Sequence, residues 1–562
     1  MAKILWWKEG PVYQIYPRSF LDTNGDGVGD LEGIRRKLDY IAGLGVTGIW
    51  LSPICPSPMV DFGYDISNYR DIDPLFGSLD DFRRLLRDAE KRGIRIIMDM
   101  VLNHSSDRHP WFVESRSGRN SAKRDWYVWH GGRRGLAGRR PPNNWMGAFG
   151  GRAWKFDEAS GEYYLHLFTE AQPDLNWRSG AMKKAMFDEL RFWLDLGVKG
   201  FRLDVINYLV KDARFRNNPY RLRPTFPRRH DLQTHIMDRN QEETFGIIRE
   251  LRALTEKYDE TMLVGEIYPD EGVHDPALAG RFLGAGDDML HLAFDFSPIY
   301  TPFRADRMED CLKSWYEKIP PAGWPCHVFS NHDQSRAATR LGGGSSGKRR
   351  NPERERHADA VARLLALLLL TQRGTPFLYY GEELGMRDGR LGRSELRDPV
   401  GVKYYPFHPG RDRSRTPMQW DDSPNGGFSA APPWLPVNGD YRERNAAAAE
   451  QDPSSILHWY RELVQARKAH GALHSGEIEF LPAPEGVLLY DRRAGDERLL
   501  AALNFSRRPR TVSLPAAAGT ILSTDRKKGS PCGKDLVLAP LEAGLFRLPR
   551  GNISIHPSSR RS

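Results

Sequence analysis

The sequence predicts a (β/α)₈ barrel with a small domain inserted after the third strand and an antiparallel β-sandwich domain at the C-terminal end. Three observations predict it. Short apolar runs alternate with amphipathic segments from residue 11 to about 380, a stretch rich in Trp, Gly, Arg and Pro interrupts the alternation, and short strands with turns follow Glu477. Apolar strands that alternate with helices are typical of a parallel sheet covered by helices on its faces.

Eight apolar, β-rich runs predict the strands of the barrel, and their number favours a closed barrel over an open sheet. Apolar residues at helical spacing predict helices between several of them. The predicted strands are Val12–Tyr16, Gly48–Ser52, Ile94–Val101, Val198–Leu203, Met262–Gly265, His291–Phe294, His327–Ser330 and Pro376–Tyr380. The predicted helices include Leu31–Leu44, Leu79–Arg92, Ala181–Leu196 and Gln241–Lys257.

These patterns divide the chain into domains. We expect the barrel to comprise residues 1–102 and 173–475, the inserted domain residues 103–172, and the C-terminal β domain residues 476–552. The segments IEFLPA, GVLLYDRR, RLLAALNF, RTVSL and GLFRLP are its predicted strands. Residues 553–562 are expected to be a disordered tail.

Composition and charge exclude several classes of protein. The formal net charge is +9, but the basic residues lie in scattered runs without a nucleic-acid-binding motif, so no nucleic-acid partner is expected. The four cysteines are far apart, which is a poor pattern for disulfides or zinc. No signal peptide and no apolar stretch of membrane-spanning length is visible, so we expect a cytoplasmic protein with no membrane partner.

Polar residues follow several of the predicted strands directly. The third run ends in Asn103 and His104, the fourth in Asp204 and the fifth in Glu266, while SNHD follows the seventh. Residues at the C-terminal ends of barrel strands face the substrate in enzymes of this fold. Because a buried, unpaired carboxylate costs several kcal/mol, to order of magnitude, repeated ionisable groups at strand ends predict an active site there.

The sequence around these residues resembles the α-amylase family, glycoside hydrolase family 13. The resemblance lies in DMVLNH (99–104), GFRLDVIN (200–207), GEIY (265–268) and FSNHD (329–333), which are similar to four signature regions of that family. QPDLNW (172–177), RGTPFLYYGEELGM (373–386) and GRDRSRTPMQWD (410–421) resemble its oligo-1,6-glucosidase and α-glucosidase branch. The similarity extends from about residue 11 to 550.

The resemblance implies a retaining mechanism with two carboxyl groups. It implies Asp204 as the nucleophile, Glu266 as the general acid/base, and Asp333 as a carboxylate that binds sugar hydroxyls and favours the transition state. Arg202 lies two residues before Asp204 on the same side of the strand, so its charge can keep Asp204 ionised. Glu266 has no cation beside it in sequence, which suits a group that must carry a proton.

The resemblance also implies a pocket for a terminal glucose. His104 and His332 are expected to bind its hydroxyls, and Asp61 and Tyr64 to hold its ring. Asp61 needs a basic partner; Arg415 is favoured and Arg411 is the alternative. The remaining candidates are Phe149 and Phe168, which are either platforms at the scissile bond or packing residues of the inserted domain, and Val205 after the nucleophile.

A metal site is predicted in the first loop. Oxygen-bearing residues alternate with others around glycines, the pattern by which a chain wraps a hard cation, in Asp22, Asn24, Asp26, Val28 and Asp30. In the family branch the matching loop binds calcium, sometimes magnesium. The alternative is a Gly/Asp turn without an ion. No organic cofactor is expected.

The sequence therefore predicts a retaining α-glucosidase that acts on short oligosaccharides of the maltose or isomaltose type, and that can also transfer glucose. In the family that the sequence resembles, a valine at the position of Val205 goes with α-1,6 linkages, although some α-1,4-acting relatives carry it too. GEIY and RTPMQWD resemble α-glucosidases that prefer short α-1,4 substrates. A transferase or isomerase of the trehalose synthase or sucrose isomerase type, and a non-catalytic binding subunit, are the alternatives. Either a monomer or a homodimer is compatible with the sequence.

Overall fold

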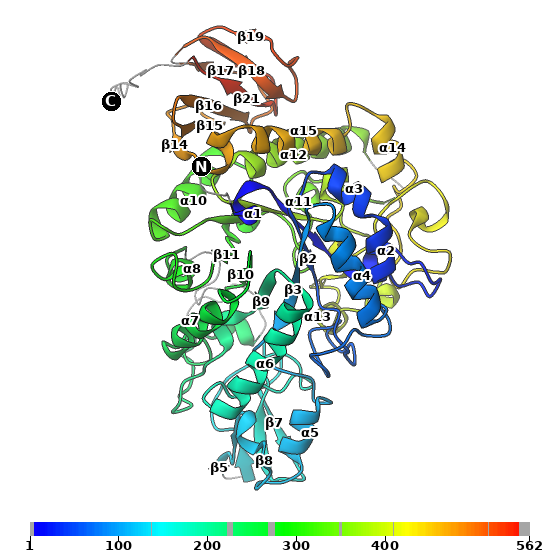
Figure 1. Ribbon diagram of the computed structural model, residues 1–562, viewed down its shortest axis with the longest axis vertical. Coiled ribbons are helices and arrows are strands. Elements are labelled where there is room, and N and C mark those ends of the chain that lie inside the picture. The colour runs from blue at the N-terminus through cyan, green and yellow to red at the C-terminus, as the bar shows by residue number, and fades with distance from the viewer. Residues whose placement is uncertain are drawn as a thin grey trace.

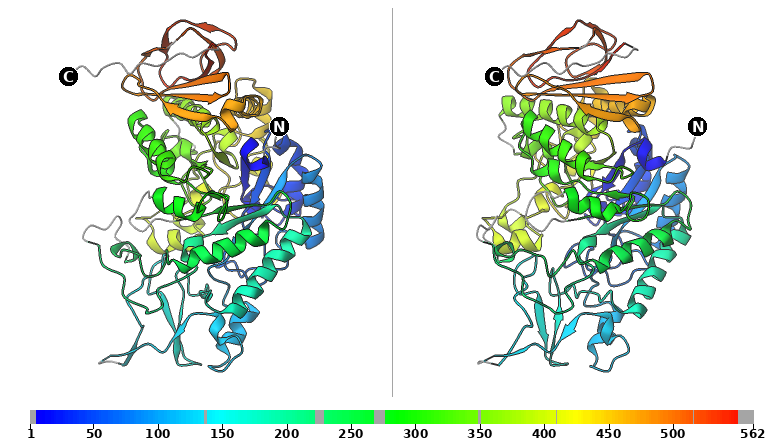
Figure 2. Two further views of the ribbon diagram at one scale, coloured as in Figure 1. Left: turned by 60° about the vertical axis from the view of Figure 1, so that its left-hand side comes forward. Right: turned by 90° about the vertical axis from the view of Figure 1, so that its left-hand side faces the viewer.

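The computed structural model describes residues 5–135, 138–221, 229–267, 276–347, 351–408, 410–514 and 516–549. The predicted C-terminal tail, 553–562, lies outside these residues. The molecule is elongated, with the barrel at its centre, the insertion at one end and the C-terminal sheets at the other (Figures 1 and 2). No helix in the described ranges is long and apolar enough to cross a membrane.

An eight-stranded parallel sheet forms the centre of the molecule, in the order β11-β10-β9-β3-β2-β1-β13-β12. Parallel bridges between Leu292 and Trp324 and between Asp295 and His327 bring its two edges together and close the barrel. All eight predicted runs overlap these strands, so the predicted barrel is confirmed. The strands are β1 (Val12–Ile15), β2 (Gly48–Leu51), β3 (Arg95–Val101), β9 (Gly200–Asp204), β10 (Met262–Gly265), β11 (Leu292–Ala293), β12 (Cys326–Val328) and β13 (Thr375–Tyr379).

Helices follow the strands and surround the barrel (Figure 1). The predicted helix 31–44 is divided in two, because Lys37 leaves helical geometry with φ −100° and ψ 9°. The other predicted helices are confirmed within a few residues. The main barrel helices are α2 (Leu31–Arg36), α3 (Leu38–Gly43), α4 (Leu79–Glu90), α6 (Gly180–Leu196), α7 (Glu243–Thr255), α8 (Pro276–Leu283), α10 (Ala305–Lys318) and α12 (Pro352–Thr371).

The start of β9 depends on two glycines. Gly197 ends α6 with φ 110°, and Gly200 opens β9 with φ 129°. A Cβ atom on Gly200 would lie 1.8 Å from the carbonyl oxygen of Met262 in β10. Both positions therefore require glycine, whose missing side chain permits positive φ and close backbone approach. This fixes the register of the strand that carries Arg202 and Asp204.

The chain between β3 and α6 forms the insertion at the lower end of Figure 1. Its antiparallel sheet has the order β4-β8-β7, and a separate hairpin pairs β5 with β6. The aromatic residues in this stretch explain its irregular sequence, because Trp145, Trp154 and Tyr163 form a buried cluster of their own that includes Val205 and Tyr208 from the barrel. Its elements are α5 (Pro110–Arg116), β4 (Trp129–His130), β5 (Arg133–Gly135), β6 (Gly138–Arg140), β7 (Trp154–Asp157) and β8 (Glu162–Leu165).

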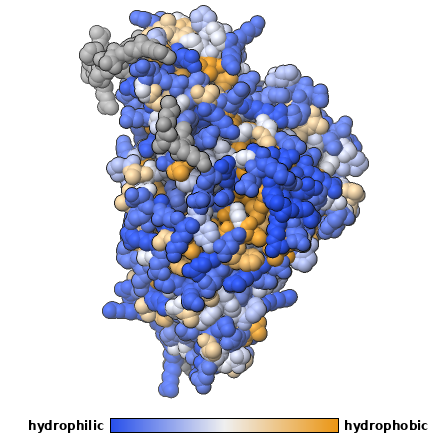
Figure 3. Space-filling view, in the orientation of Figure 1, coloured by the Kyte–Doolittle hydropathy of each residue, from blue (hydrophilic) through white to orange (hydrophobic). Residues whose placement is uncertain are grey.

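The C-terminal part is antiparallel, as predicted. One sheet has the order β14-β15-β16-β21-β18-β19, and β17 pairs with β20 in a second. The short strands β18, β19 and β20 were not predicted. The elements are α15 (Ile456–Ala469), α16 (Gly471–His474), β14 (Glu477–Phe480), β15 (Val487–Ala494), β16 (Glu497–Asn504), β17 (Arg510–Ser513), β18 (Ala518–Ser523), β19 (Pro531–Cys532), β20 (Asp535–Leu538) and β21 (Ala543–Arg547). The face of the molecule seen in Figure 3 is largely hydrophilic, with apolar side chains in scattered areas, the largest of them near its centre.

Candidate active site

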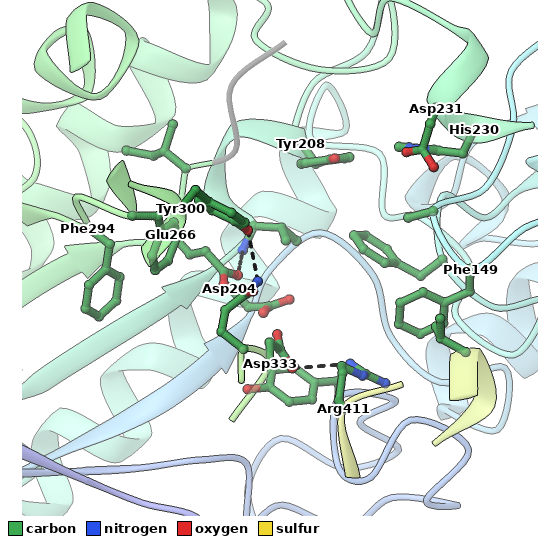
Figure 4. A pocket seen from close by; sticks show the side chains of 18 of the residues that line it. Phe149, Asp204, Tyr208, His230, Asp231, Glu266, Phe294, Tyr300, Asp333 and Arg411 are labelled. Carbon is green, nitrogen blue, oxygen red and sulfur yellow. Dashed lines mark hydrogen bonds and ion pairs between the residues drawn. The ribbon is translucent and has the colours of Figure 1, made fainter. Parts of the chain in front are cut away.

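A pocket of about 850 Å³ opens at the C-terminal ends of the barrel strands. Figure 4 shows Asp204, Glu266 and Asp333 together in it, from three different strand ends. Most of the predicted site residues line it, whereas Arg202, His332 and Arg415 lie behind its wall. The predicted residues that line it are Asp61, Tyr64, His104, Phe149, Phe168, Asp204, Val205, Glu266, Asp333 and Arg411.

Arg202 is the centre of the site. Its Nη1 lies 2.7 Å from Oδ1 of Asp204 and 2.8 Å from Oδ1 of Asp99, and its Nη2 lies 2.7 Å from Oε2 of Glu266. All four side chains are buried. Glu266 has no cation beside it in sequence, but the pairing of β9 with β10 brings Arg202 to it in space.

The three carboxyl groups around Arg202 affect one another's ionisation. Burial raises the pKa of Asp204 well above its usual value; Arg202 opposes this, and the charges of Glu266 and Asp99 add to it. Burial likewise raises the pKa of Asp99 to about 6, against the effect of Arg202. Arg202 therefore favours the ionised forms of Asp99 and Asp204 against the effect of burial.

Asp99 was not among the predicted site residues, although it begins the DMVLNH region. It accepts hydrogen bonds from Trp50 Nε1 (3.2 Å) and from the hydroxyl of Tyr64 (3.0 Å) through Oδ2. The same hydroxyl lies 2.6 Å from Nε2 of His332, whose Nδ1 accepts from Gln14 Nε2 at 2.8 Å. An amide N–H can only donate, so His332 carries its proton on Nε2 and donates it to Tyr64.

Both ring nitrogens of His332 therefore have protein partners, and burial lowers its pKa to about 3. Its ring stacks on that of Tyr64 at an angle of 4°. The predicted contact of His332 with sugar hydroxyls stays a prediction, because in this structure the residue orients Tyr64. His104 faces the pocket, with Nε2 3.0 Å from Gln172 Nε2.

Arg411, and not Arg415, is the partner of Asp61. Nη2 of Arg411 lies 2.7 Å from Oδ1 of Asp61 and 2.6 Å from Oδ1 of Asp398. The preference for Arg415 is wrong because the short 3₁₀ turn 412–414 separates the two arginines and directs Arg415 to the inner side, where its Nη2 lies 2.7 Å from Asp333. Neither Asp398 nor its contact with Arg411 is visible from sequence spacing.

Two arginine side chains contact Asp333. Arg415 Nη2 is 2.7 Å from its Oδ1, and Arg411 Nη1 is 3.5 Å from the same atom, a contact drawn in Figure 4. Burial acts to raise the pKa of Asp333, but His332, Arg411 and Arg415 together lower it below its usual range. Asp333 is therefore the member of the predicted triad most firmly held as a carboxylate.

Val205 adopts left-handed backbone geometry, with φ 37° and ψ 46°. This is rare for a β-branched residue and costs of order 1–3 kcal/mol. The turn directs the Val205 N–H to Oε2 of Glu266 at 3.3 Å, and it starts the short 3₁₀ helix Ile206–Tyr208. The strained turn thus links the end of β9 directly to Glu266.

The two predicted aromatic platforms pack on each other and on charged groups of the pocket. Phe149 and Phe168 meet edge to face with ring centroids 5.8 Å apart, and Phe168 lies 5.1 Å from the His104 ring. The Arg411 guanidinium lies 4.9 Å from the Phe149 ring centre. Both phenylalanines therefore line the pocket and also pack against neighbouring side chains.

The predicted metal loop lies apart from the pocket. Oδ1 of Asp22 accepts the N–H groups of Asn24 and Gly25, and Asn24 and Asp26 accept N–H groups further along the loop. Asp30 bonds to Thr23 and caps α2 at Gly33. Among the described residues, no three His, Cys, Asp or Glu side chains form a group that could hold a metal ion.

A pocket at the C-terminal ends of a (β/α)₈ barrel, with carboxyl groups on neighbouring strands, is the active-site arrangement of a glycoside hydrolase. The family model for the α-amylase catalytic domain matches residues 14–476. The chain belongs to the α-amylase family, glycoside hydrolase family 13.

Its relatives lie in the α-glucosidase and oligo-1,6-glucosidase branch. The chain is 43% identical over 519 residues to a probable α-glucosidase of Rhizobium meliloti (strain 1021), covering 91% of each chain. It is 39% identical over 538 residues to an oligo-1,6-glucosidase of Parageobacillus thermoglucosidasius, covering 91% of this chain and 92% of the other.

Solved structures agree with this placement. The α-glucosyl transfer enzyme XgtA matches with a TM-score of 0.89 at 40% identity, over 97% of this chain and 100% of that chain. The trehalulose synthase MutB from Pseudomonas mesoacidophila MX-45 matches with a TM-score of 0.87 at 33% identity, with the same coverage. The chain is therefore a glycoside hydrolase by family, with structural relatives named as an α-glucosyl transfer enzyme and a trehalulose synthase.

The pKa of Asp61 gives a stability prediction. Burial raises it from 3.8 to about 6, against the effect of Arg411. Ionising Asp61 therefore costs more in the folded protein than in the unfolded chain, and stability is lost as the pH rises from about 4 to about 6. Because Arg411 keeps Asp398 as a partner, its charge is not left unpaired in Asp61→Asn. The free energy of unfolding of this variant should exceed that of the wild type by about 1–3 kcal/mol at about pH 8, and should equal it at about pH 4.

Urea denaturation across this pH range checks the prediction. Asp39→Asn is the control, because Asp39 is exposed and Arg92 lowers its pKa, so this variant should gain no stability at high pH. An Asp61→Asn variant that is equally or less stable at about pH 8 would contradict the burial argument.

Proposed function

We propose that this protein is a retaining α-glucosidase that removes the terminal non-reducing α-linked glucose from short oligosaccharides of the maltose or isomaltose type. The observation that carries the proposal is that Asp204 and Glu266 contact the same guanidinium from neighbouring strands and face one pocket. A retaining glycosidase requires two such carboxyl groups, one as nucleophile and one as general acid/base.

In the proposed first step, an Asp204 oxygen forms a bond to the anomeric carbon. The glycosidic C–O bond breaks, and its oxygen takes the proton of Glu266. In the second step Glu266 accepts a proton from water, whose oxygen replaces Asp204 at the anomeric carbon. Arg202 stabilises Asp204 as a carboxylate, and Asp333 binds hydroxyls of the distorted ring.

Specificity for a terminal glucose is supported by a group of charged side chains in the pocket. Arg411 joins Asp61 to Asp398, and Asp333 is held by Arg415. These groups offer charged donors and acceptors to the hydroxyls of one sugar ring. The names of the relatives support glucose as the sugar removed.

A second candidate function is glucosyl transfer or isomerisation. XgtA is described as an α-glucosyl transfer enzyme and MutB as a trehalulose synthase, and both match nearly the whole chain. A sugar hydroxyl can react with the covalent glucosyl-enzyme intermediate in place of water, so transfer needs no additional catalytic group.

The role of Asp204 is tested by Asp204→Asn. We expect hydrolysis of p-nitrophenyl α-glucoside to fall by roughly 10³-fold or more, because the nucleophile is lost, while thermal unfolding shows that the fold survives. The control is Asp125→Asn, which changes an acidic residue of the insertion that lies outside the active-site pocket. This variant should keep its activity. Near-wild-type activity of Asp204→Asn would exclude it as the nucleophile.

The substrate class is tested by chromatographic product analysis over time on maltose, isomaltose, maltotriose, sucrose and trehalose. We expect glucose to be released from maltose or isomaltose, and larger glucosides to accumulate only at high sugar concentration. Conversion of sucrose or trehalose to isomeric disaccharides as the main reaction would favour the second candidate and contradict the first.

We also propose that the loop 22–30 binds Ca²⁺ or Mg²⁺ away from the active site. Asp22, Asn24 and Asp26 offer the oxygen atoms that such ions prefer, in a loop wrapped by its own hydrogen bonds. Removing divalent ions with EDTA should lower the melting temperature, and calcium should restore it. Asp26→Ala should abolish this response, and a wild-type protein indifferent to EDTA would contradict the site.

A further inference from the structure

The pocket has a second polar wall that the proposed chemistry does not use. The loop between β9 and α7 contributes His230, Asp231 and Gln233 to its lining. Figure 4 shows His230 and Asp231 across the pocket from Glu266, beyond Phe149 and Tyr208. This wall therefore lies away from the reacting carboxyl groups but faces the same space.

A buried contact between His235 and Asp238 supports the wall from behind. His235 Nδ1 lies 2.7 Å from Oδ2 of Asp238, and its Nε2 lies 3.0 Å from the carbonyl oxygen of His230. Both ring nitrogens of His235 therefore have oxygen partners, which fix the position of the ring. Asn218 donates to the same carboxylate at 2.9 Å, so the support is fixed on several sides.

His230 stacks on this support. Its ring centroid lies 3.8 Å from that of His235, at an interplanar angle of 22°. Burial lowers the pKa of His230 to about 4, against the hydrogen bond with Asp231, so the ring is neutral. Its Nδ1 lies 3.3 Å from Oδ1 of Asp231 and donates its proton to that carboxylate. Nε2 is then left as a hydrogen-bond acceptor.

Gln233 adds a second acceptor. Its Nε2 donates to the carbonyl oxygen of Asn144 at 2.7 Å, which fixes the orientation of the amide. Its Oε1 accepts no hydrogen bond from any described residue, although the side chain is 1% exposed. A buried acceptor without a donor is costly, by about 1–3 kcal/mol, and a bound hydroxyl group would supply that donor.

The two ends of the pocket thus differ in chemistry. The end around Asp61 presents the guanidinium of Arg411 between carboxylates, whereas the wall at His230 presents the acceptors of His230 and Gln233, with Arg221 and Arg239 also in the lining. The pocket volume of about 850 Å³ is near the upper limit of typical small-molecule sites, which reach about 1,000 Å³. There is therefore room for a second group beyond the terminal glucose.

We propose that His230 and Gln233 form the binding site for the sugar on the leaving-group side of the scissile bond, and for an acceptor sugar in transfer. The inference rests on the proposed glucosidase function and adds its substrate class: the group beyond the terminal glucose is polyhydroxylated, because the wall requires hydroxyl donors. An aromatic aglycone supplies none to it. His230 is a specificity-determining residue, and Asp231 and His235 position it.

The test compares two substrates in His230→Phe, which keeps a stacked ring and removes Nε2. We expect kcat/KM for maltotriose or isomaltotriose, whichever the wild type cleaves better, to fall about 10-fold. The value for p-nitrophenyl α-glucoside should stay within about 2-fold, because its leaving group offers no hydroxyl to His230. Transfer products at high sugar concentration should fall relative to hydrolysis. His230→Gln, which restores an acceptor, should recover part of the loss.

His458→Phe on α15 is the matched control and should change neither substrate. Equal losses on both substrates in His230→Phe would indicate a structural role and overturn the proposal, as would unchanged values on both. A wild-type protein that cleaves none of these substrates refutes the proposed glucosidase function itself, which is a separate result.

Discussion

The active site depends on one buried guanidinium. Arg202 joins Asp99, Asp204 and Glu266, which come from three adjacent strands, and Trp50 and Tyr64 pack over it. Removing one partner of a buried ion pair typically costs about 3–5 kcal/mol, because the remaining charge stays buried. Without Arg202, the buried carboxyl groups of Asp99, Asp204 and Glu266 would lose the cation that they share. The ability of Asp204 to act as an anion therefore depends on the register of β9, which Gly200 fixes.

The same division between reacting groups and supporting groups recurs around the pocket. Tyr64 is oriented by His332, which is in turn fixed by Gln14. Asp61 is held by Arg411, which is itself held by Asp398. In each case a side chain at the pocket surface is positioned by a buried neighbour, and the supporting contacts come from a distant part of the chain. Such support keeps polar groups at fixed positions, as binding and catalysis require.

The sequence predicts the barrel well because each strand is a continuous apolar run, and it predicts Asp204, Glu266 and Asp333 because polar residues at strand ends converge in this fold. Prediction from the sequence fails where two residues that are far apart in the chain are in contact. Nothing near Glu266 in the sequence indicates Arg202, and nothing in GRDRSR indicates which arginine meets Asp61, because a single 3₁₀ turn decides it. His230 and Gln233 lie in a loop with no periodicity, so only their position in space connects them to the site.

The chemistry of the pocket orients a bound substrate. A sugar hydroxyl both donates and accepts, so orientation requires that the two ends of the pocket differ. Around the terminal ring, Arg411 provides a charged donor between carboxylates. Beyond it, His230 and Gln233 provide acceptors on the opposite wall. In the proposed function, a leaving sugar held at this wall stays in the pocket after the glycosidic bond breaks, where it competes with water for the glucosyl group. The hydrogen bonds of this wall would then set the balance between hydrolysis and transfer, while the same carboxyl groups serve both reactions.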